Sequence, residues 1–117
     1  MEIWHNPRCS KSRQALALIE ERGGEPRIRR YLDDPPSAAE LELALEALGM
    51  EPWEITRKGD ALAKELGVAA MAHDRREWID LLVANPSLIE RPIILSGDGR
   101  AVLGRPPESV LEIIEPG

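Results

Sequence analysis

The chain has 117 residues, of which 43% are hydrophobic and 31% are charged, and it carries a formal net charge of -6 at pH 7. This length suits one compact domain with an ordinary core, and the mixed charges argue against a disordered chain. The acidic balance argues against broad, charge-driven binding to nucleic acid or to an anionic membrane surface, but it leaves room for a small anionic substrate.

Cys9 is the one cysteine of the chain, so neither an internal disulfide nor a C-x-x-C metal site is available to it. His5 and His73 are too far apart in sequence to suggest a metal site. No apolar run approaches the roughly 18 residues of a spanning helix, and the first residues resemble a strand instead of a basic leader. We therefore expect a cytoplasmic protein with no metal and no membrane partner.

The first third of the chain predicts a strand, a helix and a second strand. Residues 1–5 are apolar-biased and end at Asn6-Pro7, which is typical of a strand that runs into a loop. The following residues repeat at helical spacing until Gly23-Gly24, so that Ser12, Ala15, Leu16 and Ile19 share one face. Residues 26–32 predict the second strand, and such a unit has parallel strands with a right-handed crossover.

The middle of the chain predicts a mostly helical insertion over about 33–86. It begins with the "DDPPS" break, after which Ser37 and Glu40 have the spacing of a capping box. Gly49 is placed to end that helix. Two further helices are predicted, one over residues 60–66 and one that begins after Asp74.

The last part of the chain predicts two strands and a helix. The segments "RPIIL" and "RAVLG" are joined by the turn residues 96–99, which favour a hairpin. Pro106-Pro107 is typical of a helix start. Together the two ends predict a four-stranded mixed sheet with packed helices, which is an α/β (α+β) domain over residues 1–117.

Cys9 is the main candidate for a reactive group. It falls at the start of the first predicted helix, where free backbone N–H groups and the helix dipole favour a thiolate. Arg8 and Arg13 would add positive charge, and His5 would add more if protonated. An inert buried thiol is the main alternative for a lone cysteine. The same N–H groups, with the hydroxyls of Ser10 and Ser12 and the Arg13 guanidinium, would also bind a tetrahedral anion.

Three more arginines are candidate anion ligands. Arg57 lies in the insertion, Arg91 precedes a predicted strand, and Arg105 follows the hairpin. Read one at a time, each is a solvated surface charge. If the fold brings them to Cys9, their guanidinium groups would surround it.

Several segments together resemble the arsenate reductase family that couples to glutathione and glutaredoxin. They are "HNPRCSKSR", "LDDPPS", "ITRKGD", "NPSLIERPII" and "GRPPESVLEII", and they cover nearly the whole chain in the same order and spacing. The resemblance implies a thioredoxin-like fold in which Pro92 is the cis-proline. It implies that Cys9 is the catalytic nucleophile, that His5 lowers its pKa, and that Ser12 replaces the second cysteine of a glutaredoxin dithiol. Arg57, Arg91 and Arg105 would bind the oxyanion.

The reaction that the resemblance implies is reduction of arsenate to arsenite through an arsenic intermediate on Cys9. Glutathione would be a co-substrate, glutaredoxin a partner, and no cofactor would be bound. The sequence adds a constraint of its own, because a chain with one cysteine needs an external thiol to complete a redox cycle. Two alternatives stay open: a glutaredoxin-like thiol-transfer protein, and a redox-responsive transcription regulator. The missing second thiol argues against the regulator.

Overall fold

The computed structural model describes residues 1–114, which form two compact units. The N-terminal unit consists of Met1–Asp34 together with the chain from Arg91 onward, and the helical unit consists of Pro35–Glu90. The sequence predicts the insertion over 33–86, and the helical unit lies within four residues of those bounds. The last three residues of the predicted domain lie outside the described residues.

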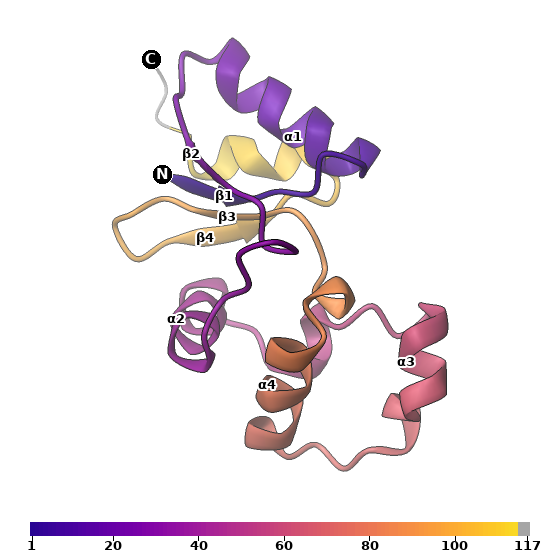
Figure 1. Cartoon of the computed structure of the whole chain (residues 1–117). Coiled ribbons are helices and arrows are strands. Elements are labelled where there is room, and N and C mark those ends of the chain that lie inside the picture. Colours follow the sequence, from indigo (N-terminus) through magenta and orange to yellow (C-terminus); the bar gives the residue numbers. More distant parts are fainter. Residues whose placement is uncertain (115–117) are drawn as a thin grey trace. The chain divides into compact units, whose positions relative to one another are not determined.

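The N-terminal unit contains one four-stranded sheet with the order β2-β1-β3-β4 (Figure 1). Its strands are β1 (Glu2–Trp4), β2 (Arg27–Arg29), β3 (Ile93–Leu95) and β4 (Ala101–Leu103). β1 is parallel to β2, whereas β3 is antiparallel to both β1 and β4. The mixed sheet confirms the predicted fold class and the parallel first pair.

β2 is shorter than the predicted strand over 26–32. The reason is local: the backbone N–H groups of Asp33 and Asp34 donate to the carbonyl of Arg30 at 3.0 and 2.9 Å. These bonds turn the chain directly after β2, so the following residues leave the sheet.

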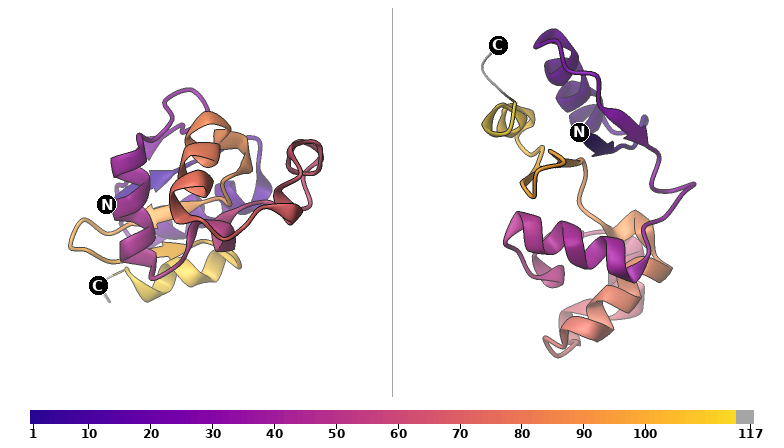
Figure 2. Two further views of the ribbon diagram at one scale, coloured as in Figure 1. Left: turned by 90° about the horizontal axis from the view of Figure 1, so that it is seen from below. Right: turned by 90° about the vertical axis from the view of Figure 1, so that its left-hand side faces the viewer.

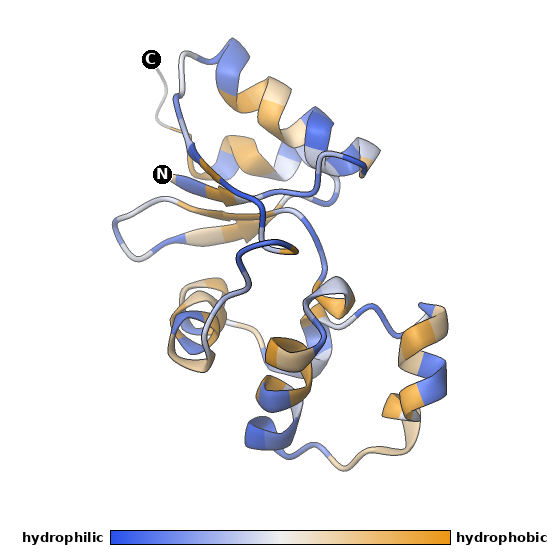
Figure 3. Cartoon of the chain, in the orientation of Figure 1, coloured by the Kyte–Doolittle hydropathy of each residue, from blue (hydrophilic) through white to orange (hydrophobic). Residues whose placement is uncertain are grey.

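Helix α1 (Ser10–Glu21) and the 3₁₀ helix η4 (Pro107–Glu112) pack together on one face of this sheet (Figure 1). Apolar residues lie along both helices and the central strands (Figure 3). The core between them contains Ile3, Ala15, Ile19, Ile94, Val110 and Ile113. Burial of these side chains is the main contribution to the stability of this unit.

The last helix differs from the prediction, because η4 is 3₁₀ and not α-helical. The backbone N–H of Ser109 donates to the carbonyl of Pro106 at 2.9 Å, and that of Ile113 donates to Val110 at 3.2 Å. These i to i+3 bonds define a 3₁₀ helix, whose six residues exceed the three or four that are usual for one. Among residues 1–114, no helix is long and apolar enough to cross a membrane.

The helical unit contains the predicted helices. They are α2 (Ala38–Leu48), α3 (Ala61–Leu66) and α4 (Arg75–Ala84), with the short 3₁₀ helices η1 (Pro52–Ile55), η2 (Val68–Ala70) and η3 (Pro86–Leu88). α4 lies between α2 and α3 (Figures 1 and 2). The predicted capping box of Ser37 and Glu40 is present, and Gly49 ends α2 with a φ of 67°. Asp60 and Asp74 cap the next two helices.

Three segments of the N-terminal unit approach one another closely at Gly104. Its N–H donates to the carbonyl of Pro92 at 2.9 Å. A Cβ at this position would lie 2.7 Å from Cγ of Pro92 and 3.2 Å from Cβ of Ala15. The hairpin, the segment before β3 and α1 therefore approach too closely for any side chain here.

We expect Gly104→Ala to lower the free energy of unfolding by about 1–3 kcal/mol, because the methyl group overpacks a filled core. Urea denaturation measures this change. Gly59→Ala is the matched control, because nothing lies within 4 Å of a Cβ there. Equal stability of the two variants would contradict the close approach.

Candidate active site

The residues between β1 and α1 form a tight turn that ends at Cys9. The N–H of Cys9 donates to the carbonyl of Asn6 at 3.0 Å, and the N–H of Arg8 donates to Asn6 Oδ1 at 3.0 Å. Pro7 occupies the second turn position, where its fixed φ is favoured. The N–H of Arg13 then donates to the carbonyl of Cys9 at 3.0 Å. Cys9 is thus the N-cap of α1.

The environment of Cys9 favours its thiolate. The thiol is half-buried, and this burial raises its pKa. The backbone N–H of Ser12, the hydrogen bond and charge of Arg91, and the N–H of Lys11 outweigh the burial, so the pKa of Cys9 lies below its ordinary value. A lowered pKa increases the fraction of the nucleophilic form at neutral pH.

Arg91 lies beside Cys9 because the segment that enters β3 runs along β1. The Arg91-Pro92 peptide bond is cis, which confirms the expectation for Pro92. Nε of Arg91 is buried and has no hydrogen-bond partner among residues 1–114. A buried donor without a partner costs free energy. An anion that accepts a hydrogen bond from this donor removes that cost, which favours its binding. Arg91 therefore both stabilises the thiolate and offers a donor to a ligand.

His5 and Ser12 form a buried pair under the turn. Nδ1 of His5 lies 2.7 Å from Oγ of Ser12, and the same Oγ accepts the N–H of Asn6 at 3.1 Å. Burial lowers the pKa of His5, and the charges of Arg30 and Arg13 lower it further. The imidazole is therefore neutral. A neutral imidazole can accept the Ser12 hydroxyl proton at Nδ1 or donate an Nδ1 proton to that oxygen, so the pair is hydrogen-bonded in either tautomer.

This pair differs from the sequence-based expectation for both residues. His5 was expected to add positive charge near Cys9 only if protonated, and burial, which lowers its pKa, disfavours that form. The Ser12 hydroxyl was predicted to donate to an anion, but it is fully buried and engaged with His5 and Asn6. Its backbone N–H, instead of its side chain, faces the sulfur.

The other candidates of the N-terminal unit are more exposed. Ser10 is exposed at the first residue of α1. Nη1 of Arg13 donates to the carbonyl of Pro7 at 2.9 Å, so this side chain stabilises the turn before Cys9. Arg105 is exposed and follows Gly104, whose N–H donates to the carbonyl of Pro92. The fold thus places Arg91 and Arg105 in the same unit as Cys9.

Arg57 belongs to the helical unit, where a backbone hydrogen bond fixes the position of its main chain. Its N–H donates to the carbonyl of Leu88 at 2.7 Å, next to the antiparallel bridge of Thr56 with Ile89. Its Nη1 lies 3.4 Å from Oδ2 of Asp60. A role of Arg57 toward Cys9 stays a prediction.

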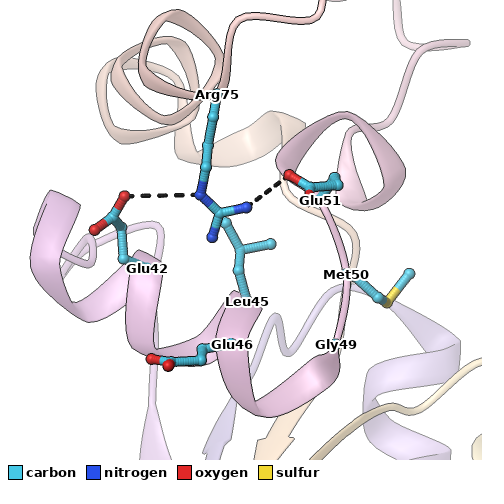
Figure 4. A pocket seen from close by; sticks show the side chains of 7 residues that line it. All are labelled: Glu42, Leu45, Glu46, Gly49, Met50, Glu51 and Arg75. Carbon is cyan, nitrogen blue, oxygen red and sulfur yellow. Dashed lines mark hydrogen bonds and ion pairs between the residues drawn. The ribbon is translucent and has the colours of Figure 1, made fainter.

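The helical unit also has a cavity of its own (Figure 4). Nη1 of Arg75 lies 2.7 Å from Glu51, and its Nε lies 3.8 Å from Glu42. Arg75 thereby links the start of α4 to α2 and to the residue before η1. The lining residues include no cysteine or other strong nucleophile, and the one cation among them is already paired. This cavity is consistent with a structural ion-pair cluster.

The architecture and the Cys9 site define a thioredoxin-like protein with one activated cysteine at the start of its first helix. The ArsC family model matches residues 4–113. The chain belongs to this family.

The relatives agree with this assignment. An uncharacterized protein in the glnII region of Streptomyces viridochromogenes is 50% identical over 117 residues, which are 97% of this chain and 98% of that protein. An arsenate reductase of Neisseria meningitidis serogroup B is 41% identical over 115 residues, 97% of each chain. The solved structure of an arsenate reductase from Vibrio cholerae has a TM-score of 0.91 at 41% identity, covering 97% of this chain and 96% of that one.

We expect Arg91→Gln to raise the pKa of Cys9, because the variant loses the positive charge beside the sulfur. The pH dependence of Cys9 alkylation by iodoacetamide measures the shift. Arg22→Gln is the control, because it removes the same charge at the opposite end of α1, where Arg22 is the C-cap. An unchanged midpoint in the Arg91 variant would rule out the assigned contact.

Proposed function

We propose that this protein reduces arsenate to arsenite, with Cys9 as nucleophile and with glutathione and glutaredoxin as external thiols. The observation that carries the proposal is the pairing of a stabilised Cys9 thiolate with the partnerless buried donor of Arg91. Membership of the ArsC family and the arsenate reductases among its relatives support arsenate as the oxyanion.

The first step is attack of the Cys9 thiolate on arsenic. The sulfur–arsenic bond forms, one arsenic–oxygen bond breaks, and the oxygen leaves as water after protonation. Arsenic stays in the +5 state. Arg91 stabilises the charge on the remaining oxygens, with Arg105 and Arg57 as further cationic ligands and Ser10 as a hydroxyl donor.

The following steps use two external thiols, because Ser12 stands where a second cysteine would be needed for an internal disulfide. Glutathione displaces a second oxygen from arsenic as water. A glutaredoxin thiolate then attacks the glutathione sulfur, and the electron pair of the sulfur–arsenic bond stays on arsenic and reduces it to the +3 state. Water finally releases arsenite from Cys9 and returns the proton to sulfur. Glutathione is a co-substrate in this scheme, and no resident cofactor takes part.

We place this reaction in the cytoplasm, where glutathione systems keep thiols reduced.

The direct test is arsenate-dependent oxidation of NADPH in the presence of glutathione, glutaredoxin and glutathione reductase. We expect turnover by the wild type and none above background by Cys9→Ser. Arg91→Gln should lower kcat/KM by about 10²–10³, the usual effect of removing one donor from a developing anion. Arg22→Gln, at the other end of α1, should match the wild type.

Absence of arsenate-dependent turnover in the wild type would refute the proposal. Turnover of glutathionylated substrates without arsenate activity would favour the thiol-transfer alternative instead.

A second prediction follows from the single cysteine. Omission of either glutathione or glutaredoxin should stop turnover after formation of the Cys9 adduct, which intact-protein mass spectrometry detects. Sustained turnover with arsenate and thioredoxin alone would contradict the assigned reductants.

A further inference from the structure

A small cavity of about 250 Å³ lies next to the Cys9 turn and takes no part in the chemistry above. It is formed by the turn after β1 and by the segment after β2. These two segments are held together where the N–H of His5 donates to the carbonyl of Arg29 at 2.8 Å. The lining residues are His5, Asn6, Pro7, Arg8, Arg30, Leu32 and Asp33. Arg8 directly precedes the nucleophile.

The cavity brings together three charged side chains that lack partners. Within residues 1–114, the side chains of Arg8, Arg30 and Asp33 make no hydrogen bond or ion pair. Nearby arginines differ, since Arg29 pairs with Asp34 and Arg27 lies 3.7 Å from Glu2. The net charge of the chain is -6, but these three side chains give the cavity an excess of one positive charge. A ligand with two negative groups and one positive group would complement them.

The positive charge of Arg30 acts on His5, and both residues line the cavity. After burial, Arg30 is the next cause of the lowered pKa of His5. His5 is therefore neutral and adds no cation of its own, so the charge pattern at the cavity is set by the two arginines and Asp33. Each guanidinium can bind a carboxylate through two parallel hydrogen bonds, and Asp33 can bind an ammonium group.

We propose that this cavity binds the charged end of the small peptide thiol that reacts at Cys9. The proposal rests on the proposed function for the need of an external thiol. Glutathione carries two carboxylates and one ammonium group, which is the complement of two arginines and one aspartate. The volume is below the roughly 300–1,000 Å³ of sites that enclose a drug-sized ligand, so the cavity takes one end of the peptide and leaves its sulfur outside, toward Cys9.

The test uses a reaction that does not involve arsenate. The Cys9 thiolate attacks one sulfur of oxidised glutathione, a Cys9–glutathione disulfide forms, and the other glutathione leaves as thiolate and takes a proton from water. Mass spectrometry follows the rate. Bis(2-hydroxyethyl) disulfide, which is uncharged, reports the intrinsic reactivity of Cys9 in each variant and corrects for any change in its pKa.

We expect Arg30→Gln and Arg8→Gln each to lower the rate with oxidised glutathione, relative to the uncharged disulfide, by about fivefold, as suits an exposed charge pair. Arg27→Gln is the matched control, because it removes the same charge from β2 three residues earlier, outside the cavity. Its ratio should stay within about twofold of wild type. Equal ratios for the Arg30 and Arg27 variants would overturn the proposal.

Asp33→Asn should change the rates of two disulfide reactions in opposite directions. It should slow the reaction with oxidised glutathione, which has ammonium groups, and speed that with 3,3′-dithiodipropionate, which has only carboxylates. A change in the same direction for both would overturn the assignment of Asp33. Because no arm contains arsenate, loss of arsenate turnover would refute the proposed function and leave this result standing.

Discussion

The site depends on one buried hydroxyl. Oγ of Ser12 joins the first turn of α1 to the end of β1 through Nδ1 of His5 and the N–H of Asn6. These bonds fix the start of the helix against the strand, so the backbone N–H groups of Ser12 and Lys11 face the sulfur of Cys9. Without them the turn would lose its tie to the helix, and the thiolate would lose its most direct stabilisation. A second cysteine at this position would exchange a strong hydrogen-bonding group for a weak one.

The sheet supplies the rest of the site. Pairing of β3 with β1 brings Arg91 to Cys9, and the hydrogen bond from Gly104 to Pro92 fixes the residue before Arg105. These candidate catalytic groups come from distant parts of the sequence, so their positions depend on strand register and close packing instead of on local turns. Such preorganisation lets a cation stabilise charge as soon as it develops on a bound anion.

Local signals in the sequence were enough to predict much of the fold. The capping box at Ser37, the glycine after α2 and the hairpin turn all act over a few residues. The expectations that the structure corrects concern long-range contacts or burial. The charges of Arg8 and Arg13 were placed near Cys9 because they are close in sequence, whereas Arg91 was named only on the condition that the fold brings it to Cys9. Strand pairing meets that condition, and Arg91 is the arginine that lowers the pKa of Cys9. The Ser12 hydroxyl was expected to donate to an anion, although helical spacing already placed Ser12 on the same face as Ala15 and Ile19, which is buried. The cavity that joins Arg8 to Arg30 was missed because its two segments are distant in sequence.

The central claim is that Cys9 is a stabilised thiolate in the resting protein. The most direct measurement is the pH titration of thiolate ultraviolet absorbance in the wild type, with Cys9→Ser as the blank. Because this is the one cysteine of the chain, the whole signal belongs to it. The account predicts a midpoint clearly below the ordinary cysteine value of about 8.5. A midpoint at or above that value would contradict it.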